Sequence, residues 1–310
     1  MEMTKTELED AFAASPDSPL FANVAKALSC PKEDVHVIEP IRAGNMNLIY
    51  LVEVDGKRYV YRHPGPGTDS IIDRKSEALS QQVAGEIGVD STFIYQHPTD
   101  GWKLSHFIEG ARALDYHNKK DVQGAMELAR RLHTSGADTG ATLDLHEDTR
   151  KQAALLSPEW RAHFSDFDEM FSIADTLDRE VKKRGLNVVL CHNDFYDTNF
   201  LITDEGMDLI DWEFSGMSDY ASDLAVFICC SDYTYDEAMD VLREYFQRDL
   251  TEDELFHCVA YLGVVSFHWL VWALYQETVN APTPFLQTYY DFTHMFETAA
   301  MEMLAAENDN

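Results

Sequence analysis

Residues 190–213 read LCHNDFYDTNFLITDEGMDLIDWE, and this stretch decides the fold that the sequence predicts. Two short apolar runs, 200–202 and 209–210, flank the turn residues 204–206, which is typical of a β-hairpin. Folding the hairpin about this turn places Asn199 opposite Asp211 at its open end. An amide oxygen facing a carboxylate forms a hard-oxygen site that suits Mg²⁺, with phosphate oxygens and waters as further ligands.

A second carboxylate, that of Asp194, lies just upstream of this expected metal site. A carboxylate beside a metal–phosphate site can accept the proton of an attacking hydroxyl, which is the base role in phosphoryl transfer. Glu213 follows Asp211 by two residues and therefore lies on the same side of an extended chain. The alternative is a hairpin whose acidic residues are merely solvated.

The spacing of Asp194, Asn199 and Asp211 resembles the catalytic Asp, the metal-binding Asn and the metal-binding Asp of the protein-kinase-like fold. Residues 192–194 (His-Asn-Asp), 210–213 (Ile-Asp-Trp-Glu) and 219–225 (Asp-Tyr-Ala-Ser-Asp-Leu-Ala) are similar to the choline/ethanolamine kinase and aminoglycoside phosphotransferase group. The resemblance implies an α+β, protein-kinase-like two-lobed fold. A small N-lobe with an antiparallel sheet is expected at residues 1–107, and a larger, mainly helical C-lobe at 108–310.

The same resemblance assigns roles that the residue pattern alone does not give. It implies ATP and Mg²⁺ as cofactors, with Asn199 and Asp211 on the metal and Glu213 supporting the metal site. It makes His192 and Asp223 a structural brace for the loop that carries Asp194.

The N-terminal half predicts a strand at 35–41 and a hairpin of 48–54 with 58–63, turned by Asp55-Gly56. Its register sets Ile49 opposite Arg62, so the loop that contains Gly44, Asn45 and Asn47 lies at the same end as Arg62. A backbone loop beside a fixed cation can cradle phosphate. Because this loop has one glycine, an ordinary strand connection is the alternative.

A helix that follows the run PGPGT at 64–68 carries Glu77. In the kinase-like fold, a strand cation pairs with a helix glutamate and is held toward the nucleotide phosphates. The match here is Arg62 with Glu77, and choline kinases resemble this chain in using Arg where most kinases have Lys. A surface ion pair, worth less than about 1 kcal/mol, is the alternative.

Strands are expected at 91–95 and 102–107, and a long helix from Lys120. Residues 106–111 between them resemble the inter-lobe hinge of the family. The backbone at Phe107 and Glu109 is accordingly expected to bind the adenine.

The chain of 310 residues has 24 Lys plus Arg against 55 Asp plus Glu, a net charge of −31. This charge disfavours nucleic acid and anionic membranes and favours cationic ligands, unless it only solubilises the surface or adapts the protein to high salt. The five cysteines show no metal-ligand spacing and are read as reduced thiols. The acidic start lacks the form of a secretion signal, so a cytoplasmic location is expected.

Residues 255–275 contain no Asp, Glu, Lys or Arg, and their length could just span a bilayer. A core helix is preferred, because no basic flank marks a cytoplasmic side. Aromatic faces beside carboxylates bind quaternary ammonium groups, at about 0.5 to 2 kcal/mol each when desolvated. Similarity to choline kinases assigns such a cage to these aromatics, which could otherwise be core residues at helical spacing: Trp269, Trp272, Tyr275, Tyr290 and Tyr235.

These observations predict an ATP-dependent kinase that phosphorylates the hydroxyl of choline. Ethanolamine, thiamine or an aminoglycoside is the alternative acceptor, and a non-catalytic binding protein of the same fold is the alternative class.

Overall fold

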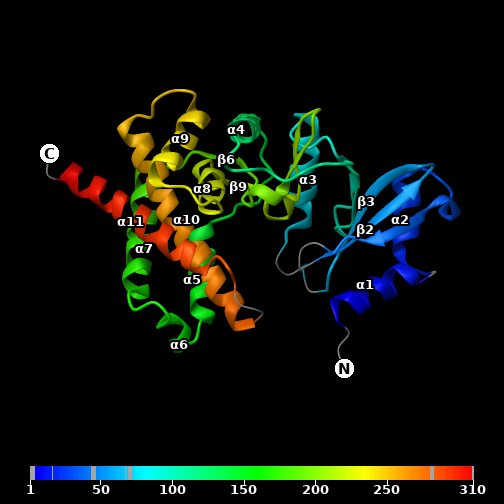
Figure 1. The fold of residues 1–310 in the computed structure, drawn as a ribbon, viewed down its shortest axis with the longest axis horizontal. Coiled ribbons are helices and arrows are strands. Elements are labelled where there is room, and N and C mark those ends of the chain that lie inside the picture. The colour runs from blue at the N-terminus through cyan, green and yellow to red at the C-terminus, as the bar shows by residue number, and fades with distance from the viewer. Residues whose placement is uncertain are drawn as a thin grey trace. The chain divides into compact units, whose positions relative to one another are not determined.

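The computed structural model describes residues 4–15, 17–42, 47–66, 68, 72–279 and 283–308. They form two compact units, one of Met1–Arg112 with Leu201–Phe214 and one of Ala113–Phe200 with Ser215–Asn310. The first is built on a five-stranded antiparallel sheet and the second is mainly helical, as the sequence predicts (Figure 1). The lobe boundary at 107/108 stays a prediction, and 201–214 joins the first unit although the sequence placed it in the C-lobe.

The sheet has the strand order β1-β2-β3-β5-β4, with every neighbouring pair antiparallel. The pairing of Ile49 with Arg62 confirms the predicted register of the central hairpin. Its two-residue turn, Asp55 and Gly56, has φ of 51° and 71°, the left-handed conformation that a tight hairpin turn needs. The strands are β1 (His36–Pro40), β2 (Asn47–Val54), β3 (Lys57–Pro64), β4 (Phe93–Gln96) and β5 (Lys103–His106).

Three helices accompany this sheet: α1 (Lys5–Ala14), α2 (Pro19–Leu28) and α3 (Arg74–Glu86). The start of α2 follows from its sequence, because Ser18 accepts a hydrogen bond from the Leu20 N–H and Pro19 occupies the first turn. Leu20 of α2 is buried in one core with Tyr50, Tyr61 and Leu104 of the sheet. This core fixes the strands whose polar side chains form the candidate site.

The predicted hairpin is present as β7 (Phe200–Ile202) and β8 (Met207–Leu209), although β8 begins before the predicted run 209–210 and ends before Ile210. The Thr203 N–H donates to the Gly206 carbonyl (2.9 Å) and closes the turn. Backbone bonds tie the hairpin to the first unit: the Arg112 N–H donates to the Ile202 carbonyl (3.0 Å) and the Leu209 N–H to the Val89 carbonyl (2.9 Å). These bonds explain why 201–214 joins that unit.

The helices of the second unit include a packed group in which α10 contacts α5, α7, α8 and α11 (Figure 1). The helices are α4 (Lys119–His133), α5 (Leu145–Leu155), α6 (Pro158–Arg161), α7 (Phe167–Arg184), α8 (Ala221–Cys229), α9 (Tyr235–Phe246), α10 (Glu252–Val279) and α11 (Leu286–Asn308). A small sheet pairs β6 (Val188–Cys191) with β9 (Gly216–Asp219).

Helix α10 contains the apolar stretch that the sequence assigned to the core. It is long and apolar enough to cross a membrane, but 78% of its apolar window is buried inside the fold. Burial of this extent fits a core helix.

Candidate active site

Arg62 on β3 is the centre of a buried charge network in the first unit. Its guanidinium donates to Glu77 Oε1, to Asp211 Oδ1 (2.9 Å) and to Glu213 Oε2 (3.2 Å). The side chains of Arg62 and Glu77 are 3% and 0% exposed, which rules out the surface ion pair. Burial alone would lower the pKa of Arg62, but the three carboxylates raise it, so this cation stays charged.

Two further cations face Glu77. Arg74 Nη1 donates to Glu77 Oε2 (2.9 Å), and Lys103 Nζ lies 3.9 Å from Glu77 Oε1. Burial alone would raise the pKa of Glu77, but Arg62, Lys103 and Arg74 together lower it. For Lys103, burial and the neighbouring Arg62 lower the pKa of the ammonium. Glu77 is therefore a buried anion held by three cations.

Asp211 and Glu213 lie at the end of the hairpin segment, next to Arg62. Asp211 has φ of 69°, a left-handed conformation that costs roughly 1 to 3 kcal/mol in a non-glycine residue. Asn47 Nδ2 donates to Glu213 Oε2 (2.9 Å), and its Oδ1 is buried with no hydrogen-bond partner among the described residues. Burial and the Asp211 charge raise the pKa of Glu213. The carboxylates of Asp211 and Glu213 and the amide oxygen of Asn47 are ligand types that fit Mg²⁺. A metal would have to compete with Arg62 for the two carboxylates.

The other residues predicted to bind the nucleotide lie in two segments of the chain. Gly44 and Asn45 lie outside the described residues. Phe107 and Glu109 line a cavity of about 400 Å³ together with Arg58 and His106. The Phe107 N–H donates to the Arg58 carbonyl (3.2 Å), and Glu109 is an exposed partner of the Arg58 guanidinium (3.4 Å). Their role toward adenine stays a prediction.

The loop that carries Asp194 belongs to the second unit, and Asn199 holds this residue. Asn199 Nδ2 donates to the Asp194 carbonyl (2.7 Å) and to Asp194 Oδ2 (2.9 Å). The amide N–H₂ of Asn199 is thus used on Asp194, which leaves its amide oxygen for another partner. Asn199 and Asp211 belong to different units, so the predicted pairing of these two residues stays a prediction.

The backbone conformation of the preceding residue accounts for an asparagine at position 193. Asn193 has φ of 62°, which Asn tolerates better than most residues, and its side-chain oxygen accepts from Ser222 Oγ (3.2 Å). The backbone turns sharply here, one residue before Asp194.

Asp223 lies at the start of α8 and is hydrogen-bonded to the loop that carries Asp194. Its carboxylate accepts the N–H groups of His192 (2.9 Å) and Asn193 (2.6 Å), and His133 Nε2 lies 3.0 Å from Oδ2. Charge-assisted bonds of this kind are roughly twice as strong as neutral ones. Asp223 therefore fixes the backbone of the loop before Asp194, and His192 takes part through its N–H rather than its ring in this contact.

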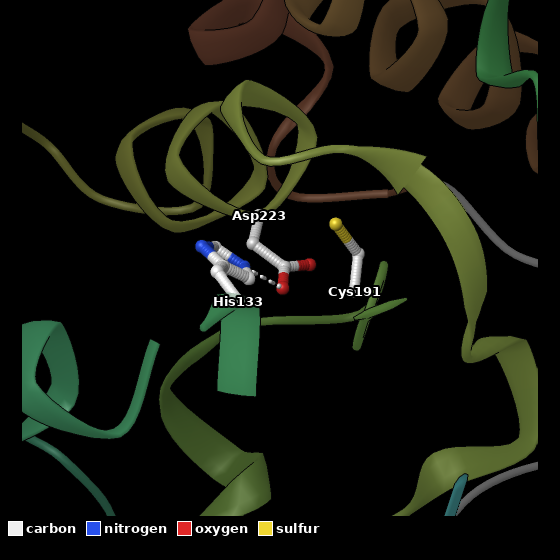
Figure 2. A group of neighbouring side chains, drawn as sticks. All are labelled: His133, Cys191 and Asp223. Atoms are coloured by element: carbon white, nitrogen blue, oxygen red, sulfur yellow. Dashed lines mark hydrogen bonds and ion pairs between the residues drawn. The ribbon is translucent and has the colours of Figure 1, made fainter. Parts of the chain in front are cut away.

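Cys191 completes a buried trio with His133 and Asp223 whose donor atoms lie within 4.8 Å of one another, close enough to suggest a metal site. Figure 2 shows the His133 ring and the Cys191 thiol on either side of the Asp223 carboxylate. The thiol instead lies 3.4 Å from the Asp219 carbonyl, and burial raises the pKa of Cys191 well above its usual value. Hydrogen bonds therefore account for this trio: the Asp223 carboxylate accepts from the loop before Asp194, and the Cys191 thiol donates to a backbone carbonyl.

Four of the five predicted substrate residues pack on one aromatic cluster in the second unit. Trp269 and Trp272 lie edge to face with ring centroids 5.4 Å apart. Both are partly exposed, as are Tyr275 and Tyr290, which pack on the same core. The Tyr290 ring stacks on Phe164 (4.1 Å). Tyr235 differs from these four residues. Its ring packs on that of Phe296, with centroids 6.1 Å apart, and Phe296 is not a member of this cluster.

The comparison with protein families decides the classification. A model described as the phosphotransferase enzyme family matches residues 37–261, more than half of the chain. The chain belongs to this phosphotransferase family. The match covers the charge network on β3, the loop of Asp194 and the brace of Asp223, so the expected class of enzyme is confirmed.

Relatives of this phosphotransferase agree with the predicted resemblance. Protein LicA of Haemophilus influenzae is 25% identical over 208 residues, which are 66% of this chain and 60% of LicA. A probable ethanolamine kinase A of Dictyostelium discoideum is 26% identical over 187 residues, 55% of this chain and 53% of that protein. The chain thus spans little more than half the length of these relatives.

Solved structures confirm the protein-kinase-like fold. A choline/ethanolamine kinase family protein from Mesorhizobium loti covers 98% of this chain and 99% of its own, at 23% identity and a TM-score of 0.73. The choline kinase LicA from Streptococcus pneumoniae covers 92% and 97%, at 22% identity and a TM-score of 0.68.

Two residues beside the candidate groups, one in each unit, were not assigned to a site from the sequence. Lys103 stands in the unremarkable strand sequence KLSH, and only the sheet register brings it beside Arg62. Tyr289 stacks on Trp269 (6.0 Å), and the signal that could have found it is its position beside Tyr290.

Proposed function

We propose that this phosphotransferase transfers the γ-phosphate of ATP to the hydroxyl of choline. The observation that supports this substrate most directly is the partly exposed aromatic cluster of Trp269, Trp272 and Tyr275 in the unit that also carries Asp194. Aromatic faces attract a quaternary ammonium by cation–π interaction. The net charge of −31 adds a long-range attraction for a cation. The choline kinase names of structural neighbours point the same way.

In this proposal Asp194 is the catalytic residue. Its carboxylate orients the choline hydroxyl and accepts its proton, while the Asn199 amide and the braced backbone keep the carboxylate in place. Asp211, Glu213 and Asn199 are the residues that would hold Mg²⁺, which when bound neutralises charge on the transferring phosphate. Arg62 and Glu77 position the nucleotide phosphates.

The first test measures ADP release with ATP and Mg²⁺, with and without choline. Choline-dependent release is expected in the wild type, with a loss of at least about 100-fold in Asp194→Ala, the range for a general base. Asp204→Ala removes an exposed carboxylate from the hairpin turn and serves as the control. If wild type and Asp194→Ala are equally inert with ATP and every amine tried, the non-catalytic binding protein is favoured, whereas equal and substantial rates would contradict the role of Asp194.

Ethanolamine is the main alternative substrate, because a relative carries that name. A primary ammonium gains less from aromatic faces than a trimethylammonium that cannot donate hydrogen bonds. Trp272→Ala is therefore expected to raise the KM for choline about tenfold or more and to change the KM for ethanolamine much less. Trp160→Ala, which removes another aromatic packed on the same cluster, is the control. Equal losses on both amines would contradict the cage, and activity on neither would direct the search to thiamine and aminoglycosides.

We also propose a cytoplasmic location. All five cysteines are free, three of them buried, which is typical of proteins in a reducing compartment.

A further inference from the structure

Lys103 is a buried cation that neither the brace nor the proposed chemistry uses. It pairs with Arg62 across β3 and β5, so the two side chains leave the same face of the sheet. Only 8% of Lys103 is exposed, and lysine is almost never buried to this extent unless a charge compensates it. The network on β3 supplies that charge.

The contacts of Lys103 differ in kind from those of Arg62. Lys103 Nζ lies 3.8 Å from Asp211 Oδ1 and 3.9 Å from Glu77 Oε1. These are the same two oxygens to which Arg62 donates hydrogen bonds. The Lys103 ammonium has three donors but makes no hydrogen bond within 3.5 Å among the described residues. Lys103 is thus held by charge and is placed to take over either oxygen when Arg62 moves away.

We propose that Lys103 is a positioning residue which, with Arg62, occupies the metal-binding carboxylates of the nucleotide-free protein and makes metal binding depend on the nucleotide. This inference rests on the proposed role of Asp211 and Glu213 as metal ligands. Lys103 acts through these carboxylates and through Glu77.

The charges of the network support this dependence. Among the described residues, Arg62, Arg74 and Lys103 lie against the carboxylates of Glu77, Asp211 and Glu213, so each of these carboxylates already faces a cation before a ligand binds. A divalent cation that enters alone meets oxygens already bonded to Arg62 and adds two positive charges next to Lys103. A polyphosphate that arrives with the metal supplies the missing negative charge and an acceptor for the Arg62 donors. Glu77 then keeps both Arg74 and Lys103 as cationic partners, with Lys103 on the oxygen that Arg62 shares, so this buried anion stays compensated.

The test is a titration of Mn²⁺ followed by its EPR signal, on nucleotide-free protein and again with a non-hydrolysable ATP analogue. Wild type is expected to bind Mn²⁺ weakly alone and at least about tenfold more tightly with the analogue. Removing the positive charge in Lys103→Met or Lys103→Gln is expected to tighten nucleotide-free Mn²⁺ binding about tenfold, because a charge a few ångströms from the metal is lost. Lys103→Arg keeps the charge and is expected to bind as weakly as wild type.

Lys57→Met is the matched control, since Lys57 is an exposed lysine on β3 of the same sheet. Thermal unfolding of each variant establishes that it is folded, and the Gln variant serves if the Met variant is not. The inference is overturned if the nucleotide-free Mn²⁺ affinity is the same in the Lys103→Met, Lys103→Gln and Lys57→Met variants. The proposed metal site still stands in that case, provided that wild type binds Mn²⁺ with the analogue. If wild type binds no Mn²⁺ with the analogue, the proposed metal site fails and the inference fails with it.

Discussion

Glu297 on α11 is a buried carboxyl group whose replacement tests the electrostatics of the helical unit. It is 1% exposed, and neither carboxylate oxygen has a hydrogen-bond partner among the described residues. Burial, reinforced by the charges of Asp166 and Glu169, raises the pKa of Glu297 to about 9. The folded protein therefore holds a proton near neutral pH that the unfolded chain releases.

The size of the effect follows from linkage. The folded pKa of about 9 lies above the ordinary value of 4.5, so folded chains bind more protons than unfolded chains across this interval. The stabilisation is complete below the unfolded pKa, and the free energy of unfolding falls as pH rises toward 9. One pH unit corresponds to about 1.4 kcal/mol, so the loss between pH 6 and pH 8 is about 3 kcal/mol. Glu297→Gln keeps the shape of the side chain and removes the titration.

Urea denaturation followed by helix circular dichroism, at pH 6, 7 and 8, measures this slope. The Glu297→Gln variant is expected to be more stable than wild type at pH 8 and to have a dependence on pH that is flatter by about 3 kcal/mol over the two units. Glu302→Gln changes an exposed carboxylate of the same helix and is expected to leave the wild-type slope. The same slope in wild type and Glu297→Gln would refute the reasoning.

Three further substitutions probe the fold and the site. Gly263→Ala places a methyl group 3.1 Å from Leu177 Cδ1 and 3.3 Å from the Glu297 backbone N, so urea denaturation should show a loss of about 1 to 3 kcal/mol despite the better helix propensity of Ala. Asp223→Asn turns an acceptor of the loop N–H groups into a partial donor, and we expect a lower melting temperature and at least about tenfold slower ADP release. Arg62→Lys replaces a planar guanidinium by a single ammonium, which cannot hydrogen-bond all three carboxylates in the same way. Thermal denaturation is expected to show a loss of about 2 kcal/mol or more in the free energy of unfolding, and wild-type stability would contradict this reasoning.

Local pattern was sufficient for the elements of the first unit. The Asp55-Gly56 turn fixes the register of its hairpin, and that register correctly set Ile49 opposite Arg62. The hairpin at β7 and β8 followed in the same way from two apolar runs about a short turn. These predictions succeeded because the position and length of a hairpin turn determine the cross-strand pairs that follow it.

The electrostatic part of the site could not be read from the sequence. Arg62 was expected to face phosphates, yet its donors are bonded to Asp211 and Glu213, which lie 149 and 151 residues away along the chain. Lys103 is part of a plain strand pattern, and Glu297 looks like a surface residue of a helix. Periodicity indicates which face of an element is buried, but not which distant charges meet there.

The packing of α10 has a consequence for how the protein is made. Helix α10 is synthesised before α11, against which it packs, so part of its apolar surface has no cover until α11 has left the ribosome and folded onto it. Domains form in the order of synthesis, and exposed apolar surface at that stage favours aggregation. A chain that has not yet packed residues 286–308 onto α10 therefore exposes an apolar face on which chaperones could act.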